Sequence, residues 1–585
     1  MRNAKIVCTL GPASDAESVI QRMVEAGMAV ARLNASHGTR DDRAAAIERV
    51  QAVDQRIDRP LATMVDLQGP EIRTAPLDEP VHLAEGSEVR FVEGETATES
   101  EVGLSHAIPS VDPGERILLD DALIEATILR VDDDAVVARI EEGGELGSRK
   151  GVNVPGVDLD LPNPTEDDRR ELELAVEQDA DYVAASFVRD AEDVYRVEEA
   201  IEDLGGEIPV VAKIERDVAV RNLDEIVDAA FGVMVARGDL GVECPMEDVP
   251  LIQKRIIRRC RESGTPVITA TEMLDSMVHA RRPTRAEASD VANAVLDGTD
   301  AVMLSAETAV GDDPVAVVET MDRIVRQVER SDEYAELREQ RVPTASESRT
   351  EALARSARYL ARDVGASAVV AASESGYTVL KTAKFRPGVP VVATTPNDDV
   401  RRRLALVGGV TARYAPYTDE GADAVVEKAV KAALDAGAAD SGDTVVVLSG
   451  MMTELEGANT TNMLKVHVAA ETLTTGRSVV PGWVSGPVSV VPDGDLTDVP
   501  NGAVVALPAD FEGEFEGDLG RIAGIVDPSP GMTGYAAMIA RELEVPMISD
   551  APVTELSDGQ QVTLDAERGV VYDGDISTAT EADRR

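Results

Sequence analysis

The sequence predicts an α/β protein organised around a (β/α)8 TIM barrel. Short apolar strand patterns alternate with amphipathic helical segments eight times, and polar residues follow every one of these strands. In barrels of this class the active site lies at the carboxyl ends of the strands. The 585 residues also exceed what one core supports, so we expect three or four domains.

The barrel elements are assigned from short apolar runs and 3.6-residue periodicity. The strand patterns are Ile6–Val7, Ala29–Leu33, Leu61–Val65, Tyr182–Ala185, Val210–Ala212, Gly232–Ala236, Pro266–Thr269 and Ala301–Leu304. The helical segments include Asp15–Ala26, Thr165–Gln178, Arg221–Ala230 and Thr284–Leu296. The polar residues after the strands include Thr9, Asn34, Ser36, Asp66, Ser186, Lys213, Glu215, Asp239, Thr271, Glu272, Ser305 and Glu307.

Two neighbouring strand patterns end in charged residues. Lys213 and Glu215 follow the first, and Asp239 follows the second. The helical segment between them has the length of one βαβ crossover, so the two strands would end side by side. An ammonium and two carboxylates at one rim suffice for a divalent metal site of the magnesium kind, completed by water and a substrate oxygen. Taken singly, each residue could instead belong to an ion pair that caps a barrel.

The residue types at this rim add to the prediction. Lysine occurs at only nine positions in the chain, so Lys213 at a strand end stands out. A compact ammonium can lie between phosphate oxygens. Gly238 lets the backbone approach a ligand closely and offers its N–H to an anion.

A segment between Arg73 and Leu161 interrupts the barrel pattern. It holds short alternating runs broken by Gly, Pro and Asp, which predict a small β-barrel inserted after the third strand. An insertion at the catalytic rim can act as a lid that excludes water, and Lys150 lies on its exit loop. We therefore assign residues 1–73 and 155–335 to the barrel and residues 74–154 to the lid domain.

The rest of the chain predicts two more domains and a tail. Residues 345–474 show strands at Ala368–Ala371, Val389–Thr394 and Thr444–Leu448, with a helix at Ala422–Leu434, and form an α/β domain. Its loops Ala372–Thr378 and Gly457–Lys465 are candidates for anion binding, although such loops are also common without ligands. Residues 476–575 are β-rich, with the only tryptophan, Trp483, and one helix, Gly534–Leu543. Residues 576–585 are expected to form a frayed tail.

Composition restricts the setting. There are 109 acidic and 57 basic residues, a formal charge of -52, which repels nucleic acid and anionic membranes. The acid excess and scarcity of lysine favour a salt-rich cytosol, since at about 1 M salt the screening length falls to roughly 3 Å. The chain begins without a secretory leader pattern, and no apolar run is long enough to span a bilayer. Cys8, Cys244 and Cys260 show no ligand spacing, so we expect a cytoplasmic protein.

Long motifs at the strand ends resemble those of the pyruvate kinase family, in that family's order and over roughly Arg2 to Ala470. They include KIVCTLGPAS, GMAVARLNASHG, DLQGPEIRT, AKIE, MVARGDLGVE, PVITATEML and MLSAET. The resemblance implies phosphoryl transfer from phosphoenolpyruvate to ADP, giving pyruvate and ATP in the last step of glycolysis. It also implies Mg²⁺ (or Mn²⁺) and K⁺ as cofactors and a homotetramer.

The resemblance implies a role for each matching residue. Glu215 and Asp239 match the Mg²⁺ ligands, and Lys213 matches the group that stabilises the phosphoryl in flight. Arg32 would clamp the substrate phosphate, and the Gly238 and Asp239 amides its carboxylate. Thr271 lies where the enolate carbon is protonated, supported by Ser186 and Ser305. These roles suit a transfer catalysed by positioning and charge stabilisation.

Two further residue sets follow from the same resemblance. The K⁺ ligands would be Asn34, Ser36, Asp66 and the carbonyl of Leu67, where the family has Thr. Glu71 matches members that need K⁺. The nucleotide contacts would be Thr9, Pro12, Asn34, His37, Arg73 and Lys150.

The α/β domain resembles the family's effector domain. Ser373, Ser375, Gly376 and Thr378 would there contact a sugar-phosphate or nucleotide effector. The segment from Gly476 resembles the mobile, swivelling phosphohistidine domain of phosphoenolpyruvate-using phosphotransferases. In GMTGYAAMIARE, Tyr535 stands at the histidine position, and all five histidines precede this domain. A phosphohistidine relay is therefore excluded, and a structural or oligomer-bracing role is expected.

Two other functions are weighed against the kinase. A Mg²⁺-dependent lyase or aldolase that stabilises a pyruvate enolate on a TIM barrel would use a similar Glu and Asp pair. It would lack the lid, the K⁺ set and Lys213 between metal and nucleotide. A catalytically inactive regulatory protein would have lost Lys213, Glu215 or Asp239, and all three are present.

Overall fold

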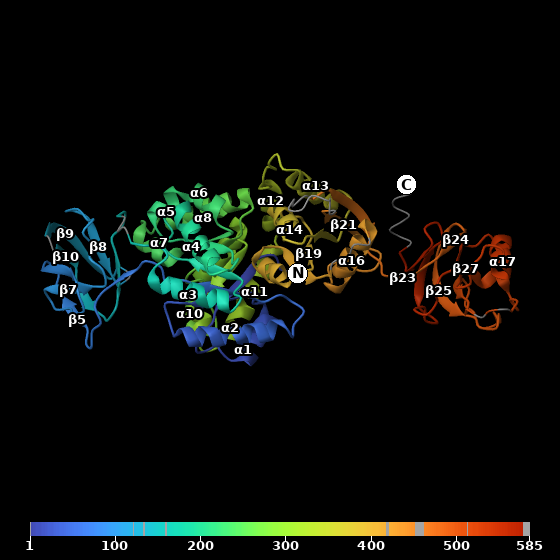
Figure 1. Ribbon diagram of the computed structural model, residues 1–585, viewed down its shortest axis with the longest axis horizontal. Coiled ribbons are helices and arrows are strands. Elements are labelled where there is room, and N and C mark those ends of the chain that lie inside the picture. The colour runs from blue at the N-terminus through green and yellow to red at the C-terminus, as the bar shows by residue number, and fades with distance from the viewer. Residues whose placement is uncertain are drawn as a thin grey trace.

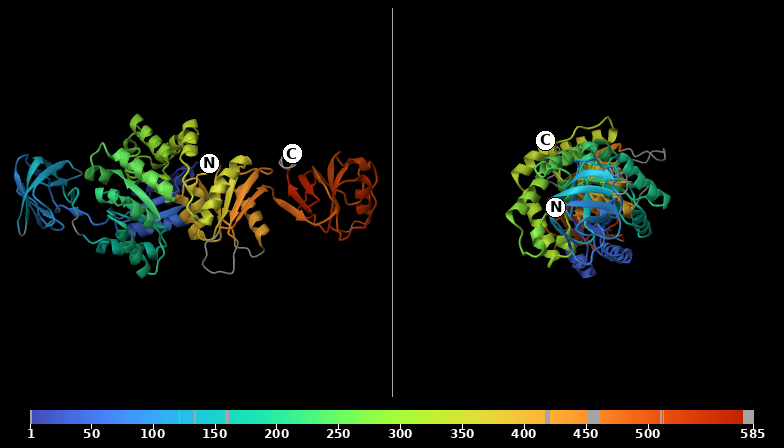
Figure 2. Two further views of the ribbon diagram at one scale, coloured as in Figure 1. Left: turned by 90° about the horizontal axis from the view of Figure 1, so that it is seen from above. Right: turned by 90° about the vertical axis from the view of Figure 1, so that its left-hand side faces the viewer.

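The four predicted parts lie in a row (Figure 1), from the lid domain through the barrel and the α/β domain to the C-terminal domain. The computed structural model describes residues 2–120, 122–132, 135–157, 161–416, 421–450, 461–509, 511 and 513–576. Viewed along the long axis the parts overlap, so the molecule is elongated (Figure 2). Among the described helices, none is long and apolar enough to cross a membrane.

The eight predicted strands form a closed parallel barrel, which confirms the fold class. The strands are β1 (Lys5–Thr9), β2 (Val30–Asn34), β3 (Ala62–Asp66), β13 (Tyr182–Ala185), β14 (Val210–Ile214), β15 (Gly232–Ala236), β16 (Val267–Ala270) and β17 (Ala301–Leu304). They pair in chain order, and β17 closes the ring on β1. Side chains such as Met64, Tyr182 and Met234 fill the interior, so the barrel is a packed core.

Helices follow the barrel strands and form the outer ring. They are α1 (Glu17–Ala26), α2 (Arg40–Asp54), α3 (Glu166–Glu177), α4 (Ala191–Asp203), α5 (Asp217–Arg221), α6 (Leu223–Ala229), α7 (Arg237–Glu243), α8 (Val249–Ser263), α9 (Arg285–Asp297), α10 (Ala306–Ala309) and α11 (Pro314–Glu329), with a 3-10 turn at Asp275–Val278. Capping boxes at Thr39, Thr165 and Thr284 start three of them. The helix predicted over Arg221–Ala230 corresponds to α6, and the short helix α5 precedes it. The two are separated at Asn222, whose side-chain amide donates to the Arg189 carbonyl at 3.0 Å.

The inserted lid domain is all-β, as predicted. Its strands are β4 (Ile72–Arg73), β5 (Val81–Leu83), β6 (Glu88–Glu93), β7 (Glu101–Leu104), β8 (Arg116–Leu119), β9 (Ile124–Asp132), β10 (Ala135–Glu142), β11 (Gly144–Leu146) and β12 (Gly151–Asn153). Seven of them form one sheet in the order β4-β12-β8-β9-β10-β6-β7, and β11 pairs with β5. A bridge between Thr74 and Leu104 joins the two edges of the large sheet, so it curls into a barrel-like shape.

The α/β domain has a five-stranded sheet in the order β20-β19-β18-β21-β22. Its elements are α12 (Asp332–Gln340), α13 (Arg349–Asp363), β18 (Ala368–Ala372), α14 (Tyr377–Lys384), β19 (Val391–Thr395), α15 (Asp398–Arg403), a 3-10 turn (Leu404–Leu406), β20 (Val410–Tyr414), α16 (Ala422–Asp435), β21 (Thr444–Ser449) and β22 (Met463–Val468). Arginines of α15 attach this domain to the amino-terminal end of the barrel. Arg401 lies 2.5 Å from Asp54, and Arg402 lies 2.8 Å from Asp181.

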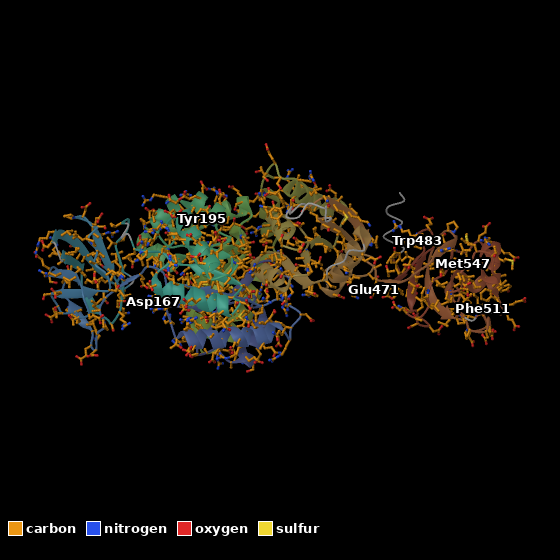
Figure 3. All side chains as sticks on the ribbon, viewed as in Figure 1. Asp167, Tyr195, Glu471, Trp483, Phe511 and Met547 are labelled. Atoms are coloured by element: carbon orange, nitrogen blue, oxygen red, sulfur yellow. The ribbon has the colours of Figure 1, made fainter. Side chains whose placement is uncertain are left out.

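The C-terminal domain is built on an eight-stranded mixed sheet. Its elements are β23 (Thr472–Thr475), β24 (Arg477–Val480), β25 (Trp483–Val490), β26 (Ala503–Ala506), a 3-10 turn (Leu519–Arg521), β27 (Ile522–Asp527), α17 (Tyr535–Leu543), β28 (Met547–Ser549), β29 (Gln561–Asp565) and β30 (Val570–Asp573). Trp483, Phe511 and Met547 all lie in this part (Figure 3), and Met547 is fully buried.

Two details of this domain bear on the predictions. The Tyr535 hydroxyl accepts a hydrogen bond from the Phe515 amide at 3.1 Å, and the two rings pack 5.7 Å apart. The predicted tail at 576–585 begins too early, because Ile576 is buried and its amide donates to Thr563 Oγ1 at 3.0 Å. Residues 577–585 lie outside the described part of the chain.

Candidate active site

The ammonium of Lys213 contacts side chains at the carboxyl ends of three barrel strands. Its Nζ lies 2.7 Å from Ser186 Oγ, 2.9 Å from Glu215 Oε1 and 3.2 Å from Asp66 Oδ1. The partners come from the ends of β13, β14 and β3. The parallel pairing of these strands brings residues far apart in the sequence to one rim, as the strand-end pattern predicts.

Asp66 joins Lys213 to a second cation. Arg32 Nε lies 2.5 Å from Asp66 Oδ2, and Arg32 Nη1 donates to Thr9 Oγ1 at 2.9 Å. Asp66 is fully buried and Arg32 is nearly so. Such pairing is what makes a buried charge tolerable.

The buried charges shift one another's pKa values. Burial would raise the pKa of Asp66, but Arg32 and Lys213 outweigh it and hold that pKa below its usual value. Burial would likewise lower the pKa of Lys213, but Asp66 and Glu215 raise it overall, so the ammonium stays charged. For Glu215 burial prevails over Lys213, and with the added repulsion of Asp239 it raises the pKa to about 7.

The oxygens of Glu215 suit a hard divalent cation. Oε2 accepts a hydrogen bond from the Phe187 amide at 2.6 Å, and the buried Oε1 lies 2.9 Å from Lys213 Nζ. Asp239 lies in the first turn of α7, directly after β15. Among the described residues, no group of three or more His, Cys, Asp or Glu is arranged for a metal.

The backbone after β16 is strained. Thr271 has φ +72°, a conformation that a β-branched residue rarely adopts. Arg237 holds it in place, because Nη2 donates to the Thr271 carbonyl at 2.6 Å and Nε donates to the Ala270 carbonyl at 2.9 Å. A Cβ on Gly238 would lie 3.0 Å from Thr271 Cγ2, so only glycine leaves this approach undisturbed.

The predicted K⁺ ligands lie together at the ends of β2 and β3, where Asn34 and Asp66 are partners in register. Asn34 Oδ1 accepts a hydrogen bond from the Ser36 amide at 3.1 Å. The Leu67 carbonyl accepts one from Ser186 Oγ at 2.7 Å. Both Asp66 oxygens face cations of the chain, Arg32 and Lys213, and the K⁺ assignment stays a prediction.

The predicted nucleotide contacts divide between the barrel rim and the lid domain. Pro12 and His37 are exposed at the rim. Arg73, at the start of the lid, lies 2.7 Å from Glu71 and donates to the Arg149 carbonyl at 2.9 Å. Lys150 lies 2.8 Å from Asp120, within the lid.

The predicted effector residues lie away from this rim, in the α/β domain at the other end of the barrel (Figure 1). Ser373 and Ser375 follow β18, and Gly376 caps α14 with φ +80°. Thr378 is buried, and its hydroxyl lies 2.8 Å from that of Thr461. In the second loop, Gly457–Lys465, residues 457–460 lie outside the described part of the chain.

Sequence reasoning assigned no role to two supports of the site. Arg237 and its partner Asp290, 2.6 Å away, anchor the strained segment after β16. Glu307 is buried and accepts amide hydrogen bonds from Ser305 at 2.6 Å and Leu274 at 3.0 Å, which fixes the loop after β17. The signal available in the sequence was their position: Arg237 directly follows strand β15, and Glu307 stands three residues after strand β17.

Comparisons with known proteins agree with this geometry. The chain matches the family "Pyruvate kinase, barrel domain" over residues 1–318, "Pyruvate kinase, alpha/beta domain" over 351–467 and "PEP-utilising enzyme, mobile domain" over 499–569. It is 40% identical to a pyruvate kinase of Geobacillus stearothermophilus, covering 98% of this chain and 99% of the relative. It is 38% identical to one of Bacillus licheniformis, covering 99% and 100%. The barrel, the lid and the Lys213 site thus belong to a chain that is a member of the pyruvate kinase family.

Proposed function

We propose that this phosphotransferase moves the phosphoryl group of phosphoenolpyruvate to ADP at the Lys213 rim, giving pyruvate and ATP. The carrying observation is that the Lys213 ammonium lies within 3.2 Å of side-chain oxygens from three strand ends. A fixed cation there stabilises the charge that spreads over the phosphoryl oxygens in flight. Arg32, held by Asp66 and Thr9, would bind the substrate phosphate.

Glu215 and Asp239 would hold Mg²⁺ (or Mn²⁺). When bound there, the ion supplies charge neutralisation and polarises substrate oxygens. The amides of Gly238 and Asp239 lie in the first turn of α7, where backbone N–H groups lack intrahelical acceptors, and they would hold the substrate carboxylate.

Proton delivery is assigned to the rim after β16. Arg237 holds the strained backbone of Thr271, and the Thr271 hydroxyl would orient the water that protonates the enolate carbon of pyruvate. Ser186 and Ser305 would maintain the rim around it. The lid domain would close over the site and bring Lys150 and Arg73 to the nucleotide phosphates, with Thr9, Pro12, Asn34 and His37 on the barrel side.

Asn34, Ser36, Asp66 and the Leu67 carbonyl would hold K⁺. The support is their clustering at two neighbouring strand ends. We also propose a homotetramer and a salt-rich cytosol. An effector would bind at Ser373, Ser375, Gly376 and Thr378. The lack of histidine in the C-terminal domain favours a structural or oligomer-bracing role for it.

The test is ATP formation from phosphoenolpyruvate and ADP with Mg²⁺ at high KCl, repeated with NaCl in place of KCl. Activity in KCl that collapses in NaCl supports both the reaction and the K⁺ site. Activity in neither salt, with the protein shown to be folded, would favour the lyase or regulatory alternative. Exchange of the pyruvate methyl protons with solvent, which an enolate-forming lyase would catalyse, then separates those two.

A further inference from the structure

Four arginines converge where the barrel, helix α12 and the α/β domain meet. Arg261 lies near the end of α8, Arg338 and Arg341 at the end of α12, and Arg386 just after α14. Together they line one small cavity of about 30 Å³, with Asp297 as the one acidic residue of the lining. In a chain with 57 basic and 109 acidic residues, such a concentration of guanidinium groups is not expected from composition.

Nearby carboxylates do not neutralise this cluster. Arg386 Nη2 lies 3.1 Å from Asp300 Oδ1. Within the described residues, no carboxylate oxygen lies within 4.0 Å of the guanidinium groups of the other three arginines. Asp297 is already bound to Lys254, at 2.5 Å.

Two guanidinium nitrogens lack any partner. The Nε atoms of Arg261 and Arg338 are buried without a hydrogen bond. A buried donor without an acceptor is costly and marks a place where a ligand or ion can bind. Burial, together with repulsion from Arg386 and Arg341, lowers the pKa of Arg261 to about 10. A bound anion would therefore stabilise the cluster.

The guanidinium groups of Arg261 and Arg386 both lie beside Gly298, the left-handed residue that ends α9. A Cβ built on this residue would lie 3.7 Å from Arg261 Nη1 and 3.9 Å from Arg386 Nη1. The two cations therefore lie near the same backbone position, and Arg261 Nη1 also donates to the Asp297 carbonyl at 3.3 Å.

The size of the cavity restricts the ligand. A single water needs about 10–15 Å³ of such space, so a cavity of about 30 Å³ accommodates one compact ion. We propose that this cavity binds one halide ion, chloride in the cell, between Arg261, Arg338 and Arg386. The bound anion would relieve repulsion among residues of the barrel, α12 and the α/β domain and would tighten their junction.

Bromide provides a direct test, because it replaces chloride and scatters X-rays anomalously. Crystals of the full chain transferred into bromide should show an anomalous peak in the arginine cavity. A second dataset from Arg338→Gln crystals should lack that peak and keep any peaks elsewhere. No peak in the wild-type cavity, or one that persists unchanged in the variant, would overturn the proposal.

Thermal unfolding at constant K⁺ and ionic strength, with acetate replaced stepwise by chloride, tests the site in solution. Acetate is the more strongly excluded anion and stabilises proteins generally, so non-specific salt effects run the other way. A specific site predicts a saturable rise in Tm of about 2–4 °C with chloride. Arg338→Gln should lose this rise, and the exposed control Arg22→Gln should keep it. A monotonic fall in Tm for the wild type, or an equal rise in both variants, would contradict a halide site.

Discussion

Replacement of Lys213 by methionine tests the central charge of the site. Methionine keeps the length and apolar stem of the side chain but removes the ammonium that lies 2.7 Å from Ser186 and 2.9 Å from Glu215. Loss of one preorganised donor from a developing anion typically lowers turnover by about 10²–10³. Lys213 carries a full charge and its side chain is only 12% exposed, so water screens it poorly. We therefore expect a fall in kcat of at least about 10³.

Metal binding should survive this substitution. Asp66 keeps Arg32 at 2.5 Å, so this carboxylate stays paired. Glu215 loses its nearest cation, which raises its pKa further, but the substitution also removes a positive charge that repels the metal. Mn²⁺ binding, measured by electron paramagnetic resonance at pH 8.5, should therefore persist.

The assay is steady-state pyruvate formation with Mg²⁺ at saturating phosphoenolpyruvate and ADP. Lys431→Met is the matched control, because Lys431 forms an exposed pair with Glu471, at 3.3 Å, and surface pairs of this kind contribute little. This control should retain turnover. A Lys213→Met protein that is folded, binds Mn²⁺ and turns over within tenfold of the wild type would refute the role assigned to Lys213.

Three further predictions follow from the site and the C-terminal domain. Glu71→Lys, which replaces the carboxylate next to Arg73, should restore activity in NaCl by supplying the positive charge internally, and an unchanged KCl requirement would count against the K⁺ site. The pKa of about 7 means that Glu215 holds a proton below pH 7, and Mn²⁺ must displace that proton to bind. The Mn²⁺ dissociation constant should therefore fall about tenfold for each unit that the pH rises toward 7, and level off at higher pH. Between about pH 4.5 and 7 the unfolded chain loses the Glu215 proton while the metal-free folded protein keeps it, so the folded state should become less stable as pH rises through this range. Glu215→Gln should flatten both the binding and the stability profile. Tyr535→Phe removes the acceptor of the Phe515 amide and should cost about 1 kcal/mol of C-terminal domain stability by urea unfolding, with turnover unchanged; a large loss of turnover would mean that this domain contributes to catalysis.

The barrel was predictable because its signal is local. Each strand is an apolar run followed by a polar residue, and the parallel register then brings Asp66, Ser186 and Lys213 together without further information. The lid domain was recognisable from alternation alone, since its helix-free pattern differs from the barrel on both sides.

Sequence reasoning could not predict the contacts that depend on three-dimensional packing. That Arg237 bonds the carbonyls after β16 follows from the geometry of two neighbouring strand ends, and no periodicity reveals it. The break at Asn222 depends on its bond to Arg189 in a different barrel unit. Burial of Ile576 depends on Thr563 across the last sheet, whereas the sequence there is simply polar.

The attachment of α15 to the barrel also affects how the whole molecule meets its solvent. Arg401 and Arg402 are partly or fully buried against Asp54 and Asp181, so these cations serve domain junctions. Each such arginine is buried together with its carboxylate partner, so the excess of 52 negative charges remains on the rest of the molecule, where it faces the hydration layer. Mobile cations will condense on that layer. Exchange of K⁺ for Na⁺ therefore changes the ion atmosphere of the entire enzyme as well as the occupant of the proposed internal site.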